Sequence, residues 1–479
     1  MNQETSQSRF RVPLFLGPLV ALILVVVLFA VLDGLYSQGR FFTADNLSNI
    51  SIQTCVYALA AVGMTVVIIS GGIDLSCGTA VTLSATVVAF CIYHDVGSQL
   101  ANGSNVRDAA VRVAQLIEKR DDTPRLAEAK ERLRAVIGIK QQRLETQWGQ
   151  VQAAMKDRGW LELSAEQEET LQSEEPGKYD DYERMEKDYK RLRENVETQA
   201  RRVEELRSDD FYLSVEAAKQ DWGNKLPNHP LTVYLAILGG VGTGLLCGLA
   251  NGMAIAFLKI VPFVVTLGTM TIFLGIGNLI SGNVPIRTVR GDMVPSWLYQ
   301  SLSLNSEFLF LGLPPGIWAL VAAALLVGLV LRSTVFGRYS FALGSNEATA
   351  RLCGINVSWQ KLLIYALSGA LIGLAGVFQF SRLTVGDPES GLGLELKVIA
   401  AVVIGGGSLT GGRGSIAGTL CGAVMLAVIL NGCTQLGLPV SIEKIVVGAI
   451  IIFAVFLDQP APKQWMRNLF ERRKTGKAA

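Results

Sequence analysis

The charged residues of this 479-residue chain are concentrated in one internal block, and this limits what the chain can fold into. About 50 of its 84 lysine, arginine, aspartate and glutamate residues fall within residues 101–230. Outside that block, apolar runs approach the roughly 20 residues that cross a bilayer as a helix. The sequence therefore predicts an all-α polytopic membrane protein with a water-facing insertion, and it excludes an ordinary soluble enzyme.

Ten apolar segments are predicted to be transmembrane helices, and glycines break some of them. The first is too long for a removable signal and lacks its small-residue cleavage site, so we expect it to remain as a span. The segments are residues 16–35, 51–70, 77–93, 231–258, 261–280, 308–331, 362–380, 396–407, 416–430 and 445–456.

The predicted organisation is three spans in residues 1–94, the charged insertion in 95–230, seven spans in 231–458, and a basic tail in 459–479. With ten spans, the main basic stretches fall on one face, which the positive-inside rule makes cytoplasmic. Both termini and the loop at 332–361 are then cytoplasmic, and the insertion lies on the outer side. These stretches contain Arg9, Arg11, Arg332, Arg338, Arg351, Lys361, Arg413, Lys463, Arg467, Arg472, Arg473, Lys474 and Lys477.

The insertion is predicted to be a helical hairpin. Asp122-Thr123-Pro124 indicates a cap and a first-turn proline, opening a helix to about Arg158. Pro176-Gly177 then breaks the chain, and a second helix follows with a coiled-coil heptad. Each helix has about 30 residues, roughly 45 Å, so the pair can leave the membrane and return. It is either a docking or oligomerisation surface or a tolerated loop expansion. The apolar stripes are Leu133, Ile137, Leu144, Trp148, Val151 and Met155, facing Tyr182, Met185, Tyr189, Leu192, Val196, Gln199, Val203 and Leu206.

Several kinds of site are excluded by residue type. The net charge of +2 is too small to indicate a nucleic-acid partner. The seven cysteines form no disulfide or CxxC pattern, and His94 and His229 are isolated, so no metal site is predicted. Gly407-x4-Gly412-Arg413 resembles a phosphate loop but lacks its lysine, its Ser/Thr and its preceding strand. No catalytic residue, cofactor or ATPase site is therefore expected in this chain.

A few polar residues interrupt the apolar segments and are candidates for lining a pathway. They are Asp74, Ser76, Asn251, Thr266 and Glu395. Asp74 either caps the following helix or binds a solute, and Asn251 and Thr266 either bind a hydroxylated solute or bond to a neighbouring helix. The helix breaks beside them are expected at glycines Gly71, Gly72, Gly405, Gly406 and Gly407.

The loop Gly337–Ile355 contains the signals of a short helix. Ser345 or Asn346 can cap it, Glu347 and Ala348 fit its first turn, and Gly354 can end it. It is either a short amphipathic helix presented to the cytoplasm or an interfacial loop.

Four ordered motifs together resemble a known family. They are Gly63-Met64-Thr65 with Gly71-Gly72-Ile73-Asp74-Leu75-Ser76, the stretch from Asn251-Gly252 to Thr266-Leu267-Gly268, Gly337–Ile355, and Ala400–Gly414. They are similar to the permease subunits of bacterial ABC sugar importers of the ribose, xylose, arabinose and galactoside group. The resemblance covers about residues 14–94 and 231–458, and residues 95–230 have no counterpart in the typical member.

The resemblance implies a permease subunit of the bacterial inner membrane, surrounded by membrane lipid, that forms the pathway for a ribose- or xylose-like monosaccharide. A second copy would complete a homodimer, and a periplasmic binding protein would deliver the sugar on the side of the insertion. ATP would be bound by a separate cytoplasmic ATPase subunit. That subunit would grip a coupling loop formed by Gly337, Arg338, Asn346, Glu347, Ala348, Arg351 and Gly354.

Other functions remain open. A related permease could carry a branched-chain amino acid, a nucleoside or an autoinducer. A self-powered secondary transporter also uses broken helices, but the spans offer no clustered acids and no histidine for an ion site. A membrane-anchored coiled-coil scaffold would need only one or two spans.

Overall fold

The computed structural model describes residues 16–36, 41–102, 109, 124–161, 163–174, 176–205, 228–288, 290, 293–304 and 309–458. Within these ranges, strand is limited to β1 (Ile286–Arg287) and β2 (Val385–Gly386), so the expected all-α class is confirmed. Several predicted features lie outside the described residues: Arg9, Arg11, the tail 459–479, the Asp122-Thr123 cap and the heptad position Leu206.

The chain divides into two compact units, which are described separately. Unit 1 contains residues 1–90, 237–286 and 296–479, and unit 2 contains residues 91–236 and 287–295. The charged insertion falls in unit 2, and most of the apolar helices fall in unit 1.

Each of the ten predicted apolar segments falls on a helix. These helices are α1 (Leu16–Tyr36), α2 (Ala44–Ile69), α3 (Cys77–Tyr93), α10 (Pro230–Phe257), α11 (Pro262–Ser281), α13 (Pro315–Ser333), α16 (Val357–Leu383), α17 (Leu394–Ile404), α18 (Ile416–Gln435) and α19 (Val440–Asp458). Shorter elements of the same unit are α12 (Ser296–Tyr299), α14 (Val335–Ser345), α15 (Glu347–Leu352) and the 3₁₀ turn η2 (Pro388–Gly391).

Among the residues that the structure describes, seven of these helices are long and apolar enough to cross a membrane: α1, α2, α10, α11, α13, α16 and α18. Helix α3 has 17 residues, and α17 has only 11. At about 1.5 Å per residue, α17 covers roughly half of a bilayer core of about 30 Å. The chain is therefore a multi-pass membrane protein in which one predicted span is a half-length helix.

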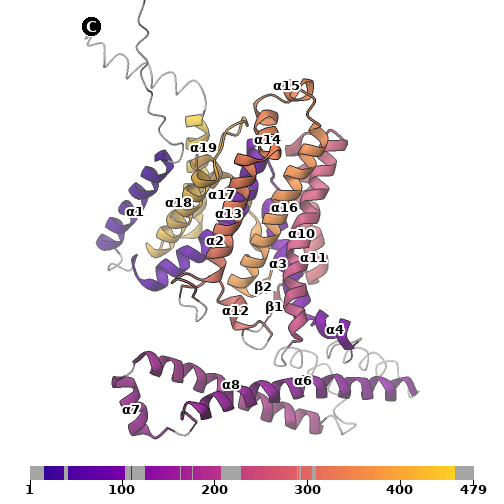
Figure 1. Cartoon of the computed structure of the whole chain (residues 1–479), viewed down its shortest axis with the longest axis vertical. Coiled ribbons are helices and arrows are strands. Elements are labelled where there is room, and N and C mark those ends of the chain that lie inside the picture. Colours follow the sequence, from indigo (N-terminus) through magenta and orange to yellow (C-terminus); the bar gives the residue numbers. More distant parts are fainter. Residues whose placement is uncertain are drawn as a thin grey trace, which may run out of the picture. The chain divides into compact units, whose positions relative to one another are not determined.

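Helix α2 is the centre of unit 1. It packs against α13, α16, α17 and α18 (Figure 1). Of the residues in its most apolar 18-residue stretch, 83% are buried. A helix that is apolar on every side is stable only when other helices surround it or when lipid does, and α2 is surrounded by helices. In α1, by contrast, only 11% of the residues in the corresponding stretch are buried, so α1 lies at the periphery.

Glycines bring α10 and α16 into backbone contact. Gly244 and Gly248 are four residues apart on α10, and Gly369 and Gly373 are four apart on α16. A methyl group on Gly369 would lie 2.7 Å from the Gly248 α-carbon, and one on Gly248 would overlap the Tyr365 carbonyl. Small residues at this spacing let two membrane helices approach closely. This packing positions the functional side chains described below.

Unit 2 contains α4 (Val96–Asn102), α6 (Pro124–Asp157), α7 (Ala165–Glu174) and α8 (Pro176–Glu205). The predicted first helix is confirmed by α6, which lies beside α8 (Figure 1). Buried side chains of the two predicted stripes form the seam: Leu133, Ile137, Leu144, Met155, Tyr182 and Leu192. Trp148 and Tyr189 stack across it with ring centroids 6.1 Å apart.

The structure corrects the prediction for the hairpin turn. Pro176 was expected to break the chain before the second helix, but it is the first residue of α8. At this position its missing amide proton costs no helical hydrogen bond. The additional helix α7 fills the connection before it.

Candidate functional site

The loop between α2 and α3 is the centre of the candidate site. Helix α2 ends at Ile69, and Gly71 adopts a positive φ of +82°, which an L side chain rarely adopts. The amide of Gly72 then returns to the Val67 carbonyl at 3.0 Å. The helix is therefore broken at the predicted glycine pair.

Asp74 is bound within its own loop. One carboxylate oxygen, Oδ1, accepts hydrogen bonds from the Ser76 amide at 2.9 Å and the Ser76 hydroxyl at 2.6 Å. The side chain is 2% exposed. This is an Asx-turn, in which the side chain bonds to the backbone two residues on, and it ends just before α3 begins at Cys77.

Asn251 and Thr266 approach the same loop from α10 and α11. The Asn251 side-chain amide donates to the Ser76 hydroxyl oxygen at 2.8 Å, which joins Asp74, Ser76 and Asn251 in one chain of hydrogen bonds. The Thr266 hydroxyl donates to the carbonyl of Pro262, in its own helix, at 3.0 Å and lies 3.3 Å from the Ile73 carbonyl. Both side chains are almost completely buried.

Glu395 reaches the first turn of α3 from α17. Its Oε1 accepts a hydrogen bond from the Gly393 amide at 3.0 Å, whereas its Oε2 is buried with no hydrogen-bond partner among the described residues. A methyl group on Gly78 would overlap this Oε2, so only glycine allows the approach. All five predicted pathway residues therefore lie at or beside residues 70–78.

Tyr365, on α16, is a further polar group at this place. A methyl group on Gly72 would lie 2.7 Å from its hydroxyl oxygen, and that hydroxyl has no partner among the described residues. Sequence reasoning passed over Tyr365 as part of an apolar run, although a tyrosine hydroxyl between aliphatic neighbours is a signal that could have been noticed.

Three buried polar atoms around the loop lack a hydrogen-bond partner within the described chain: Asn251 Oδ1, Tyr365 Oη and Glu395 Oε2. Each such atom costs about 1–3 kcal/mol when it is left unpaired. Together they offer a phenolic hydroxyl, an amide oxygen and a carboxyl oxygen to a small polar molecule or to water.

The second glycine-rich segment meets the first one. Gly406 has a φ of +90°, and Gly405 packs against the start of α18. The chain then runs to the end of α2, where the Gly412 amide donates to the Ile69 carbonyl at 2.8 Å. A methyl group on Gly411 would lie 2.9 Å from the Gly71 α-carbon.

Helix α14 joins the same contact. A methyl group on Gly344 would overlap the Ile69 carbonyl and would lie 2.6 Å from the Gly412 amide nitrogen. We name Gly71, Gly344, Gly411 and Gly412 the glycine junction. At this junction, the ends of α2 and α14 and the 405–415 segment touch through their backbones.

The short helix predicted after α14 is present as α15. The Asn346 side chain caps it by accepting a hydrogen bond from the Thr349 amide at 2.9 Å, and Gly354 follows it with a φ of +83°. Gly337 is buried against the Leu331 backbone, and Arg338 is exposed. Helices α14 and α15 lie together at one end of unit 1 (Figure 1).

Two cations surround Glu347 in the first turn of α15. Lys361 Nζ lies 2.8 Å from one carboxylate oxygen and Arg351 Nη2 lies 3.2 Å from the other. Burial opposes ionisation of Glu347, but these two cations outweigh it and lower its pKa. Beside this ion-pair cluster, Leu352 is 89% exposed, which leaves an apolar side chain projecting from the helix.

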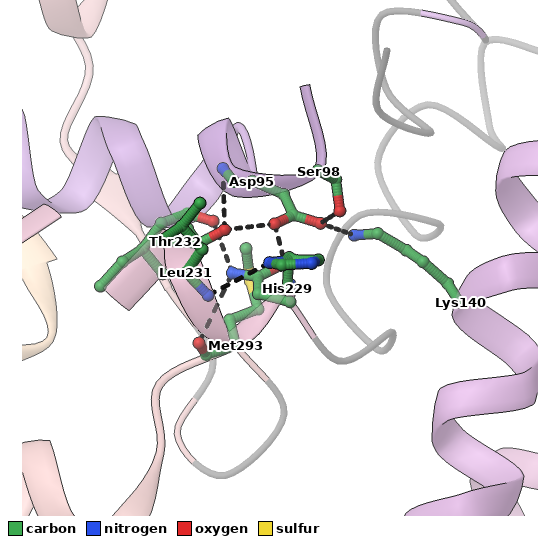
Figure 2. A network of polar contacts seen from close by, with 10 residues as sticks. Asp95, Ser98, Lys140, His229, Leu231, Thr232 and Met293 are labelled. Carbon is green, nitrogen blue, oxygen red and sulfur yellow. Dashed lines mark hydrogen bonds and ion pairs between the residues drawn. The ribbon is translucent and has the colours of Figure 1, made fainter. Parts of the chain in front are cut away.

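In unit 2, Asp95 is the centre of a polar network (Figure 2). Its Oδ1 accepts hydrogen bonds from the Thr232 hydroxyl at 2.5 Å and the His229 amide at 3.0 Å. Its Oδ2 accepts a hydrogen bond from the Ser98 hydroxyl at 2.6 Å. The same oxygen forms an ion pair with Lys140 Nζ at 2.8 Å. The two ends of the insertion and the middle of α6 therefore meet at one carboxylate. Sequence reasoning missed this network.

Comparison with known proteins gives the family. The family model described as "Branched-chain amino acid transport system / permease component" matches residues 46–104 and 211–455. It leaves unmatched the part of unit 2 that contains α6, α7 and α8. No solved structure matches the chain.

Curated relatives carry related names. Ribose import permease protein RbsC of Escherichia coli (strain K12) is 35% identical over 228 residues, covering 48% of this chain and 70% of that protein. L-arabinose ABC transporter permease protein AraH of Azospirillum brasilense is 36% identical over 228 residues, covering 48% and 65%. Fructose import permease protein FrcC of Rhizobium meliloti is 36% identical over 245 residues, covering 49% and 64%. On these matches, the chain belongs to the family of ABC importer permease components, non-catalytic multi-pass proteins of the membrane.

Proposed function

We propose that this chain forms the membrane passage for a monosaccharide in an ABC importer. The main support is a set of three buried oxygen atoms around the α2–α3 loop that have no hydrogen-bond partner among the described residues. They belong to Asn251, Tyr365 and Glu395. Sugar hydroxyls donate and accept hydrogen bonds, so they can satisfy such atoms in a conformation that opens the loop to the passage. The names of the ribose, arabinose and fructose permeases support the same substrate class.

A separate ATPase subunit is proposed to dock on α15. Its exposed Leu352 and the Glu347 ion-pair cluster provide an apolar contact beside a charged rim, which is the common composition of a protein interface. The glycine junction supports a mechanical route, because α14 contacts Ile69, the last residue of α2, and Asp74 follows only five positions later in the α2–α3 loop. Movement of α15 would then be transmitted to the passage.

We base the proposed orientation on the basic residues around α14 and α15. Basic residues occur in the last turn of α13 (Arg332), in α14 (Arg338), in α15 (Arg351) and near the start of α16 (Lys361). This run of cations supports a cytoplasmic position for this end and for both termini. The insertion is then on the outer side, where a periplasmic sugar-binding protein would arrive. We propose that the α6–α8 hairpin guides or brackets this protein and that a second copy of the chain completes a homodimer.

Uptake in proteoliposomes tests the proposed function. The full chain is reconstituted with the ATPase and the binding protein encoded beside it, and uptake of ribose, xylose, arabinose and fructose is compared with uptake of leucine. ATP-dependent uptake of one sugar is expected. Uptake of leucine alone would favour the amino-acid substrate that the family description names and would refute a sugar.

Deletion of the insertion tests the role of the hairpin. Removal of residues 101–228 from an expressed and correctly inserted chain is expected to weaken capture of the loaded binding protein while leaving ATPase association intact. Unchanged transport by the shortened chain would refute the proposed role of the hairpin without affecting the rest of the proposed function.

A further inference from the structure

A groove between α13, α14 and the start of α18 has not entered the proposed function. Its volume is about 620 Å³, within the range of roughly 300–1,000 Å³ that is typical of ligand pockets. Its lining residues are Val321, Ala324, Leu325, Gly328, Leu329, Leu331, Arg332, Phe341, Ser415, Ile416, Ala417 and Leu420.

The groove is apolar and recessed. Ala324 and Leu331 are 4% and 7% exposed and form its floor, whereas Leu325 and Leu329 are 63% and 61% exposed at its rim. Gly328 lines open space in the groove, because a methyl group at this position would meet no atom within 4 Å. These side chains can hold a hydrocarbon chain along α13 but offer it no polar partner.

One end of the groove is cationic. Arg332 lies in the last turn of α13 and is exposed, and it lines the groove together with Ser415 and Ala417. Ser415 caps α18 by accepting a hydrogen bond from the Gly418 amide, and the first amides of a helix add positive potential. An apolar channel with a guanidinium at its membrane-interface end matches an acyl chain with an anionic headgroup.

We propose that this groove binds an anionic glycerophospholipid, with one acyl chain between α13 and α18 and the phosphate at Arg332. A second copy of this chain is a less suitable occupant, because it would have to insert a projecting apolar segment and also present an anion to Arg332. The site is distinct from the α2–α3 loop, and it relies on the proposed function only for placing Arg332 in the cytoplasmic leaflet.

Lipid retention by the full chain tests the proposal. The protein is reconstituted in nanodiscs that contain equal amounts of phosphatidylglycerol and phosphatidylcholine, released, and weighed by native mass spectrometry. Retained phosphatidylglycerol is expected to exceed phosphatidylcholine. Gly328→Leu, which fills the groove, and Arg332→Gln, which removes the cation, are each expected to reduce phosphatidylglycerol retention about tenfold.

Two matched variants control for general effects. Leu326→Phe enlarges an exposed α13 side chain that does not line the groove, and Arg338→Gln removes an exposed cation of the same loop. Both are expected to retain phosphatidylglycerol as the unmodified chain does. Equal retention of the two lipids, or full retention by both groove variants, would overturn the proposal. So would a change from dimer to monomer in Gly328→Leu, because the occupant would then be a second copy.

Discussion

The ammonium group of Lys140 lies 2.8 Å from the carboxylate of Asp95, and the two side chains are only 4% and 3% exposed. These residues are 45 positions apart, one directly after α3 and one in the middle of α6. The same carboxylate binds Thr232, at the start of α10. Because a buried charge is costly unless it is paired, we expect this contact to favour one position of α6 within unit 2.

Breaking this pair is expected to loosen the hairpin. Asp95→Ala leaves the Lys140 ammonium buried without its anion and should cost about 3–5 kcal/mol in the stability of unit 2. The measurement is thermal unfolding of the purified full chain, combined with limited proteolysis of α6. Lys190→Met, which breaks the exposed Lys190–Glu186 pair, serves as the control and should have little effect on stability, because water screens an exposed ion pair. Equal effects of the two variants would contradict a structural role for the buried pair.

The same pair predicts a dependence on acid. Burial opposes ionisation of Asp95, but Lys140 and the hydrogen bonds from Ser98 and Thr232 outweigh it and lower its pKa to about 2. Because the folded-state pKa is below the unfolded value of about 3.9, this stabilisation is complete above pH 4 and is lost as the pH falls toward 2. The hairpin should therefore lose on the order of 2 kcal/mol between pH 5 and pH 2.

This pH effect can be assigned to Asp95 by comparing variants. The melting temperature of unit 2 is measured from pH 5 to pH 2 in the unmodified chain and in Asp95→Asn, which cannot titrate at this position. The difference between the two chains should shrink as the pH falls. A constant difference across the range would show that another group is responsible.

The glycine junction predicts a transport defect without loss of the membrane fold. Gly344→Ala places a methyl group against the Ile69 carbonyl and the Gly412 amide, neither of which can move independently of its helix or loop. Uptake is expected to fall at least about tenfold while ATPase association is retained. Gly242→Ala is the matched control, since no atom lies within 4 Å of the added methyl. Normal uptake by Gly344→Ala would refute the proposal that movement of α15 is transmitted to the passage through the glycine junction.

The exposed Leu352 predicts a contact with the ATPase subunit. Leu352→Asp is expected to reduce co-purification of the ATPase about tenfold or more, because it puts a charge into an apolar contact. Leu352→Met keeps the apolar surface and should bind normally. Retention of the ATPase by Leu352→Asp, and also by Glu347→Arg combined with Gly354→Trp, would exclude α15 as the docking helix.

The unpartnered Tyr365 hydroxyl separates a transport role from a structural one. Tyr365→Phe removes a group that makes no hydrogen bond within the described chain, so thermal stability should be unchanged or slightly higher. If the hydroxyl binds sugar, the KM for uptake should rise about tenfold. Tyr57, on α2, is also buried, and Tyr57→Phe should leave the KM unchanged. An unaltered KM in Tyr365→Phe would exclude this hydroxyl from the substrate contacts.

Local features were predictable because their causes are local. The ten apolar helices follow from hydropathy along neighbouring residues, including the half-length α17, and the start of α6 follows from the proline at Pro124. The cap at Asn346 and the end at Gly354 confirm a short helix that is specified by residues within nine positions. Helix α7 and the helical role of Pro176 were missed, because a proline that follows acidic residues fits a chain break as well as a first turn.

By itself, then, the sequence determined the membrane class, the ten apolar helices, the long helices of the insertion and five of the polar residues that are proposed to line a passage. Only the tertiary structure decided which of them meet. Asp74 and Glu395 are more than 300 positions apart, and their common place beside Gly78 depends on how α3 packs against α17. The ion pair between Lys140 and Asp95 and the backbone contact between Gly344 and Ile69 depend on helix packing in the same way. These contacts form between elements that hydropathy and capping specify independently, so they depend on shape complementarity that no local pattern contains.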